Sequence, residues 1–87
     1  MDVVNNRDAG RYETDGGYIA YTRDGDVVTM AHTEVDPQRQ GQGLGGELVR
    51  QALNDVRSQG LRVRPSCPFV AAYIRDHAEY ADLVSDD

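Results

Sequence analysis

Alternation of apolar and polar residues predicts a β-hairpin near the start of the chain. The segment "YIAYTRDGDVVTMAHTEV" contains two β-rich stretches joined around Asp24-Gly25, a dipeptide favoured in tight hairpin turns. We expect strands over residues 17–22 and 27–35. Asp36-Pro37 ends the second strand, because proline cannot donate a hydrogen bond to a strand ladder.

After this hairpin, apolar residues no longer recur at every second position, as in a strand, but at every third or fourth position, as in a helix. The apolar positions form one stripe, which consists of Leu44, Leu48, Val49, Ala52, Leu53 and Val56. Gly60 follows in the position that commonly ends a helix. The pattern therefore predicts an amphipathic helix that ends just before Gly60.

The C-terminal part predicts one more strand and one more helix. The segment "LRVRPSC", residues 61–67, alternates apolar and polar residues as a half-buried strand does. After Pro68, the aromatic and aliphatic residues from Phe69 to Tyr73 predict a helix that ends near His77. The tail beyond it is expected to add a short turn or an edge segment.

These elements, with a short strand predicted over 11–14, give the order β-β-β-α-β-α in a single domain, residues 1–87. The first ten residues are weakly patterned, and we expect them to be flexible. The strands 27–35 and 61–67 flank a helix, so they form a βαβ unit with parallel strands and a right-handed crossover. The fold class is therefore a mixed α/β sheet, with one face incompletely covered.

Composition narrows the function mainly by exclusion. The chain has 87 residues, of which 39% are hydrophobic and 28% charged, as in an ordinary globular domain. A net charge of −6 argues against nucleic acid as a partner, since non-specific binding to it needs clustered cations. No apolar run approaches the roughly 20 residues that cross a membrane, and no signal peptide is recognisable, so we expect a cytoplasmic protein. Cys67 is the single cysteine, and no metal site is predicted.

The segment "QRQGQGLGG", Gln38 to Gly46, places four glycines where the first helix begins. Glycine inside a helix costs about 1 kcal/mol relative to alanine. A strand-to-helix junction exposes unpaired backbone N–H groups, and glycine allows a bulky pyrophosphate to reach them. We interpret the run as an anion cradle. The alternative is a turn that needs glycine only for close packing of helix on sheet.

Two phosphate-binding motifs fail on their context. Gly41-x-Gly43-x-x-Gly46 matches the dinucleotide fingerprint, but the next strand offers Arg62 and Arg64 where that fold needs an acidic residue. The P-loop of nucleotide triphosphatases requires a lysine, and the sequence contains none.

A third motif fits its setting. Gln38-x-x-Gly41-x-Gly43 matches Q/R-x-x-G-x-G/A, the acyl-CoA pyrophosphate signature of the GNAT superfamily of N-acetyltransferases. "HTEV", "QGQGLG" and "CPFVAAYIRDHAEYADLV" also occur in the order found in small single-domain GNAT-like proteins, except that Ala78 replaces a proline. The chain resembles this family from about residue 17 to residue 84. The resemblance implies a minimal GNAT-like fold and an enzyme that transfers an acetyl group from acetyl-CoA to an amine.

The resemblance also implies where the cofactor lies, namely between the strands 27–35 and 61–67. The pantetheine arm is expected to pair with the backbone of Thr33, Glu34 and Val35. The pyrophosphate is expected to bind backbone amides of the glycine loop, with help from a side chain at its start. The loop residues implied are Gln38, Arg39, Gln40, Gly41, Gln42, Gly43, Leu44 and Gly45.

Three side chains are candidates for the chemistry. Tyr73 corresponds to a tyrosine that protonates the departing CoA thiolate in many superfamily members, or it is an aromatic packing residue. Glu34 shares a strand face with His32 and is a candidate general base, or both are structural polar groups. Cys67 precedes a helix that lowers its pKa, so it is a candidate acetyl acceptor, or it is a small buried hydrophobe. His77 is expected to be a polar residue at a helix end.

The acceptor is expected to be a large or cationic amine. Between the strands 11–14 and 17–22 the chain has only a tight turn, where other superfamily members carry helices that wall the acceptor site. An open site suits a protein amine, or a wall supplied by a second subunit, so monomer and homodimer both stay open. A net negative charge attracts cationic amines. The alternative function is a catalytically inactive module that senses CoA or acyl-CoA.

Overall fold

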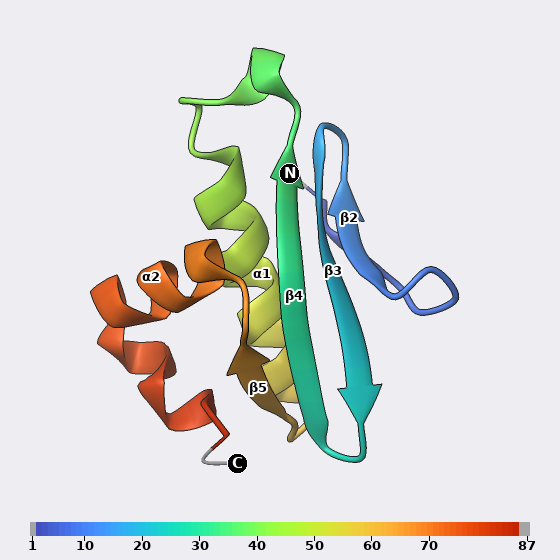
Figure 1. The fold of residues 1–87 in the computed structure, drawn as a ribbon, viewed down its shortest axis with the longest axis vertical. Helices are drawn as coiled ribbons and strands as arrows, with labels where there is room; N and C mark the ends of the chain where they lie inside the picture. The colour runs from blue at the N-terminus through green and yellow to red at the C-terminus, as the bar shows by residue number, and fades with distance from the viewer. Residues whose placement is uncertain (1, 86–87) are drawn as a thin grey trace.

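The computed structural model describes residues 2–85, which form one five-stranded sheet in the order β1-β2-β3-β4-β5 with helices beside it (Figure 1). The strands are β1 (Val4–Asn6), β2 (Arg11–Thr14), β3 (Gly17–Asp24), β4 (Val27–Val35) and β5 (Arg62–Pro65). The helices are α1 (Leu44–Ser58) and α2 (Pro68–Asp76), with the short 3-10 helices η1 (Pro37–Arg39) and η2 (Ala78–Leu83). The predicted mixed α/β fold is confirmed, with one additional short strand, β1, at its start.

The sheet pairs as predicted. Strands β1 to β4 pair antiparallel in sequence order, and β4 pairs parallel with β5 through the crossover helix α1. Strand β3 is longer than the predicted 17–22, because Asp24 pairs with Val27 and leaves a two-residue turn. Gly25 opens that turn with a φ of 62°, which suits the positive φ of tight hairpin turns.

Strand β5 is shorter than the predicted 61–67. The N–H of Ser66 donates to the carbonyl of Arg64 at 3.0 Å, which bends the chain away from the ladder. Cys67 then caps the N-terminus of α2. The alternating pattern of this segment therefore continues past the point where the strand ends, and the second half of β4 has no strand beside it on the edge away from β3.

One hydrophobic core lies between the sheet and both helices. All six residues of the predicted helical stripe are buried, and those after Leu44 belong to one core cluster with Ile19, Met30 and Val63 from three strands. The tail after α2 is both a turn and an edge segment, since η2 is followed by a parallel bridge between Val84 and Val63. None of the helices in the described residues combines the length and the apolar character needed to cross a membrane.

A β-bulge at Ala31 changes which residues of β4 face the core. The register with β3 skips this residue, so the alternation of side chains shifts by one beyond it. Met30 before the bulge and Thr33 after it both face the helices, where Met30 is fully buried and the Thr33 hydroxyl contacts α2. His32 and Glu34 lie together on the opposite face, and their side chains are 58% and 56% exposed. This face of the sheet is open there, as the sequence predicts.

Candidate functional site

A cleft of about 440 Å³ opens where β4 ends and α1 begins, at the upper end of Figure 1. It exists because β5 stops at Pro65 while β4 continues to Val35, and the chain then turns through η1 into α1. The residues that line it are Thr33, Val35, Arg39, Gln40, Gly41, Gly43, Leu44, Gly45, Gly46 and Phe69. The cleft therefore joins the free end of a strand to the N-terminus of a helix.

The backbone of β4 presents hydrogen-bonding groups to this cleft. Asp36 N–H donates to the carbonyl of Gly16 at 2.7 Å, and alternate residues of an antiparallel strand bond to the same neighbour. The N–H and C=O groups of Thr33 and Val35 therefore turn away from β3, toward the side that β5 leaves free. Gln40 Nε2 donates to the carbonyl of Val35 at 3.3 Å. An extended ligand can add to this edge as a further strand would.

Helix α1 begins without a side-chain cap. Its N-cap residue is Gly43, with a φ of 77°, and the first helical bond runs from Glu47 N–H to the carbonyl of Gly43 at 3.1 Å. The N–H groups of the first turn thus have no side-chain acceptor. A Cβ at Gly41 or Gly43 would meet no atom within 4 Å, so the space over both residues is open. Their positive φ also favours glycine, and the loop can receive an anion.

The other glycines of the run serve a different purpose. A Cβ at Gly45 would lie 2.8 Å from the ring of Phe69, so Gly45 allows α2 to approach α1 closely. A Cβ at Gly46 would make an ordinary contact of 3.7 Å with Tyr73. The packing interpretation of the glycine run therefore applies to Gly45, whereas Gly41 and Gly43 leave the loop open. That this open loop binds an anion stays a prediction.

Arg39 is the cationic residue among those that line the cleft. Its Nη2 lies 2.7 Å from the carboxylate of Asp15, and its aliphatic stem covers Gly16. The Asp15 side chain is 92% exposed, so the guanidinium is held at the cleft mouth by a solvated partner. Gln38 and Gln42 do not line the cleft, and the N–H of Gln38 donates to Asp36 at 3.0 Å.

Cys67 lies next to the wall of the cleft. Its Sγ is 3.4 Å from the hydroxyl of Thr33, and its residue is 5% exposed. Burial raises the pKa of the thiol, but hydrogen bonds from the Thr33 hydroxyl and from the backbone N–H groups of Val70, Phe69 and Thr33 outweigh it. The pKa of Cys67 is therefore below its ordinary value, as expected for a cysteine at a helix N-terminus.

Tyr73 packs between aromatic neighbours. Its ring stacks on His77 with centroids 3.9 Å apart, and the ring of Tyr80 lies 6.1 Å away. His77 Nδ1 is 2.8 Å from the carbonyl of Tyr73, which holds this histidine at the end of α2. Burial raises the pKa of the Tyr73 hydroxyl, so it stays protonated at neutral pH. Tyr73 does not line the cleft.

Glu34 and His32 lie on the open face of the sheet, outside the cleft. His32 Nε2 is 2.7 Å from Glu34 Oε2, and the ring of Tyr18 meets His32 edge-on at 6.3 Å. The guanidinium of Arg11 covers the other side of Tyr18, 4.1 Å from the ring centroid. These residues form a connected polar row across β2, β3 and β4. The backbone of β4 separates that row from the cleft.

The structure thus brings together most of the proposed cofactor residues and divides the proposed catalytic ones. Cys67 adjoins the cleft, whereas Glu34 and Tyr73 lie elsewhere. Sequence reasoning did not identify Phe69 and Gly46 as cleft residues. The helical spacing of Phe69 and Tyr73 was a signal, because it puts both rings on the side of α2 that meets the glycines of α1.

In the described part of the chain, no group of three or more histidine, cysteine or carboxylate side chains could hold a metal ion.

Comparisons with known proteins agree with this geometry. The family model of GCN5-related N-acetyl-transferase matches residues 8–83. The fold is similar to the solution NMR structure of a GCN5-like protein from Staphylococcus aureus, with a TM-score of 0.74 and 20% sequence identity, over 98% of this chain and 88% of that one. No curated protein sequence matches the chain. Because the family model covers most of the chain, the protein belongs to the GCN5-related N-acetyltransferase family.

Proposed function

We propose that the protein is an acetyl-CoA-dependent N-acetyltransferase that transfers the acetyl group to an amine acceptor. The observation that carries this proposal is the cleft between the free edge of β4 and the uncapped first turn of α1. It offers a strand edge for an extended arm and a set of N–H donors for a diphosphate. CoA contains both, since its pantetheine arm joins the diphosphate to the thiol that carries the acetyl group. Membership of the family supports the same cofactor.

Each part of the cofactor has a proposed partner. The pantetheine arm pairs with the backbone of β4, and the pyrophosphate accepts hydrogen bonds from the glycine loop. Arg39 adds a guanidinium at the mouth, where it can bind a phosphate oxygen while remaining near Asp15. The proposed cofactor residues are Thr33, Glu34, Val35, Gln38, Arg39, Gln40, Gly41, Gln42, Gly43, Leu44 and Gly45.

The geometry favours a route through Cys67. The thiolate attacks the thioester carbonyl, an S–C bond forms, and CoA leaves as a thiolate that takes up a proton. The amine then attacks the acetyl-cysteine, releases the Cys67 thiolate and loses one proton to solvent or a base. Support comes from the contact of Cys67 with Thr33 in the cleft wall and from its lowered pKa.

Direct attack of the amine on acetyl-CoA is the second route. It assigns Glu34, with His32 beside it, as the base that deprotonates an amine arriving on the open face of the sheet. It assigns Tyr73 as the acid that protonates the CoA thiolate. Neither Glu34 nor Tyr73 lines the cleft, so this route has less support from the arrangement of side chains than the cysteine route.

Intact-mass measurement after mixing with acetyl-CoA tests the proposal. We expect a single-acetyl adduct that Cys67→Ala abolishes, and release of free thiol when a panel of amines is added. Thiol release that persists in Cys67→Ala without an adduct would support direct transfer. Binding of CoA with neither adduct nor turnover on any amine would contradict the enzyme and support the CoA sensor instead.

The acceptor proposed is a large or cationic amine, such as an amine of a protein. Strands β2 and β3 are joined only by Asp15 and Gly16, so no helix walls the open face beside Glu34. A lysine-containing peptide should therefore give a higher kcat/KM than a small neutral amine of similar basicity. A cytoplasmic location and a monomeric or homodimeric state stay predictions.

A further inference from the structure

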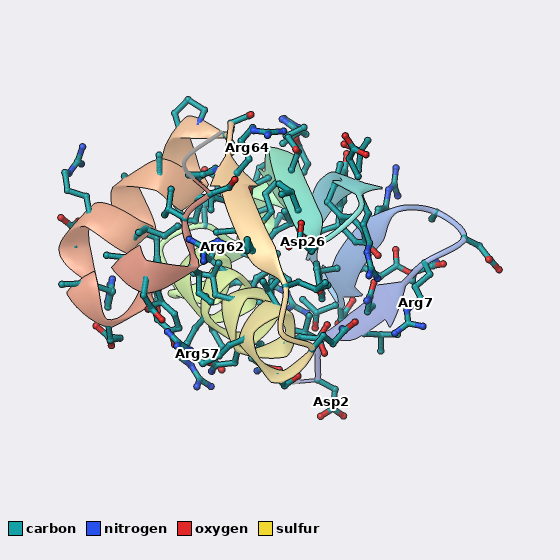
Figure 2. All side chains as sticks on the ribbon, turned by 90° about the horizontal axis from the view of Figure 1, so that it is seen from below. Asp2, Arg7, Asp26, Arg57, Arg62 and Arg64 are labelled. Carbon is teal, nitrogen blue, oxygen red and sulfur yellow. The ribbon has the colours of Figure 1, made fainter. Side chains whose placement is uncertain are left out.

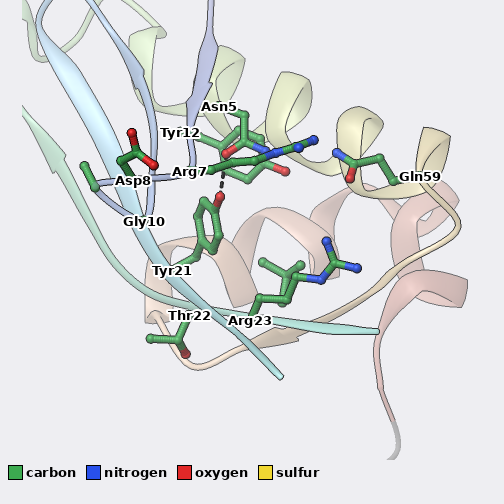
Figure 3. Close-up of a pocket in the computed structure, with 11 residues that line it drawn as sticks. Asn5, Arg7, Asp8, Gly10, Tyr12, Tyr21, Thr22, Arg23 and Gln59 are labelled. Carbon is green, nitrogen blue, oxygen red and sulfur yellow. Dashed lines mark hydrogen bonds between the residues drawn. The ribbon is translucent and has the colours of Figure 1, made fainter. Parts of the chain in front are cut away.

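A second hollow, of about 470 Å³, lies at the other end of α1 from the glycine loop. Figure 3 shows the residues that line it. It is bounded by the β1–β2 connection, by the ends of β3 and α1, and by the start of β4, and it shares no residue with the cleft. Helix α1 has 15 residues and so separates the two by about 22 Å. The volume is in the range of pockets that bind small molecules.

Two arginines that line this hollow, Arg7 and Arg23, form no ion pair with a carboxylate of the described residues. Arg57, which Figure 2 shows on the opposite side of the molecule from Arg7, is by contrast paired with Asp82 at 2.9 Å. Within residues 2–85, Arg7 makes no side-chain hydrogen bond or ion pair. Arg23 donates only its Nε, to the carbonyl of Gly25 at 2.9 Å. The terminal N–H groups of both guanidiniums are therefore free to bind a ligand.

The two arginines frame the hollow. In Figure 3, Arg7 and Arg23 extend in the same direction from two sides of it, and the amide of Gln59 points toward them. Tyr12 and Tyr21 also line the hollow, and their ring centroids are 5.1 Å apart. The hollow thus combines cationic donors at its rim with an aromatic wall.

Backbone and side-chain bonds hold this arrangement in place. Tyr21 N–H donates to the carbonyl of Gly10 at 2.8 Å, and Gly10 N–H donates to the carbonyl of Arg7 at 3.3 Å, so the β1–β2 connection is tied to β3. The hydroxyl of Tyr12 donates to Asp55 at 2.7 Å, and the hydroxyl of Tyr21 donates to Asn5 Oδ1. Tyr12 is 3% exposed and belongs to the core, so the half-buried Tyr21 is the tyrosine that offers its ring, rather than its hydroxyl, to a ligand.

We propose that this hollow binds a small ligand with an oxyanion head group, a carboxylate or a phosphate, and a planar apolar body. Guanidinium groups bind such oxygens with paired N–H donors, and the Gln59 amide adds a further one. The apolar body packs on the half-buried ring of Tyr21, which the buried ring of Tyr12 supports from the core. This site is separate from the acetyl-CoA cleft and does not depend on the proposed function.

Two carboxylates near the arginines refine the proposal. Asp55 already accepts hydrogen bonds from Tyr12 and from Gln59 Nε2, both at 2.7 Å. Asp8 lines the hollow and is exposed, and it forms no ion pair with either arginine. Asp8 is thus the charge that opposes an oxyanion, and removing it should strengthen binding.

An NMR titration of the whole protein tests this site, with phenyl phosphate and benzoate as probes and benzylamine as the cationic control. We expect saturable shifts of the arginine Nε–Hε signals and of the amides of residues 7–10 with at least one oxyanion. Arg7→Gln and Arg23→Gln should each weaken binding about tenfold or more, since each removes charged hydrogen bonds. Arg75→Gln, a matched change on α2, should leave the affinity for the oxyanion probes unchanged, and Asp8→Asn should increase it.

The two probes separate the sources of the head group: tighter binding of phenyl phosphate indicates a phosphate ligand, and of benzoate a carboxylate. Shifts confined to residues 40–45 would overturn the proposal, because the probe would then bind only the cofactor cleft. Oxyanion affinity equal to that of the wild type in both the Arg7→Gln and Arg23→Gln variants, with well-dispersed spectra, would overturn it too. So would weaker oxyanion binding after Asp8→Asn, or benzylamine binding as tightly as the oxyanions.

Discussion

The thiol of Cys67 donates to the hydroxyl of Thr33 on β4 at 3.4 Å. In the thiolate form, the sulfur accepts from that hydroxyl and from backbone N–H groups of the first turn of α2. Thr33→Val removes the hydroxyl donor and keeps the shape, so the pKa of Cys67 should rise toward its ordinary value. The rate of alkylation by iodoacetamide, measured against pH without cofactor, should then reach its midpoint at a higher pH. Thr29→Val, on the other face of β4, is the control. An unchanged midpoint in Thr33→Val would contradict this account of the thiol.

Gly45 and Gly46 are adjacent residues whose replacement by alanine should have opposite consequences. Gly46→Ala should raise the free energy of unfolding by about 0.5–1 kcal/mol, because alanine is the better helix former and the new Cβ makes an ordinary contact. In Gly45→Ala the new Cβ would lie 2.8 Å from Phe69, whose exposed ring lines the cleft and must shift. We therefore expect Gly45→Ala to lack the stabilisation predicted for Gly46→Ala, and its affinity for CoA to be lower than that of the wild type. Urea unfolding of both variants checks this; equal stabilisation would show that the packing is loose.

At the level of the elements, a buried hydrogen bond joins β2 to α1. The hydroxyl of Tyr12 donates to Asp55 at 2.7 Å, and Tyr12 is 3% exposed. Burial, and then the bond to Asp55, raise the pKa of Tyr12 above its unfolded value of about 10. A group whose pKa is raised by folding contributes its full stabilisation to the folded state at pH values below its unfolded pKa. That contribution decreases as the pH rises above the unfolded pKa.

Tyr12→Phe should therefore lower the free energy of unfolding by about 1–2 kcal/mol at pH 7, because a buried hydrogen bond is lost. Above pH 10 the unfolded tyrosine ionises in the wild type, so the difference between the two proteins should shrink. Denaturant unfolding at pH 7 and between pH 10 and 11 measures both effects. A difference that is constant or grows with pH would be inconsistent with a protonated, buried Tyr12.

The elements were largely predictable because their apolar residues repeat with a clear period. The stripe from Leu44 to Val56 and the hairpin strands needed no tertiary information. Strand β1 was not predicted, since its residues, Val4–Asn6, are mostly polar and pair only through β2. The length of β5 depends on the bend at Ser66, which an alternating pattern does not reveal.

The candidate site divides in the same way. The loop from Gln40 to Gly43 was predictable, because a local motif specifies its backbone. The period of a strand also predicted that His32 and Glu34 share a face. That this face is turned away from the cleft follows from the bulge at Ala31 and from the side on which the helices pack. Both are tertiary features, and therefore a local pattern could not separate Glu34 from Cys67.

The whole molecule carries a net charge of −6, whereas CoA carries negatively charged phosphates. Their mean interaction is repulsive, and Arg39 offsets it only locally, beside Asp15. Raising the ionic strength from 0.01 to 0.15 M shortens the screening length from about 30 Å to about 8 Å. The association rate of CoA should therefore increase severalfold, as stopped-flow measurements can determine. A rate that falls with salt would mean that a local positive field controls the encounter.

The account as a whole depends on the amides of the glycine loop facing a space that receives a diphosphate. A two-dimensional NMR titration with CoA measures this most directly. Gly41→Ala and Gly25→Ala form a matched pair, because both glycines have a positive φ and open space at the Cβ position, but only Gly41 lines the cleft.

We predict saturable shifts of the amides of residues 40–45, together with Thr33 and Val35, while residues 7–10 remain unmoved. Gly41→Ala should weaken CoA binding and Gly25→Ala should not. The account would be contradicted if saturating CoA left the amides of residues 40–45 unchanged, or if both variants bound CoA as tightly as the wild type.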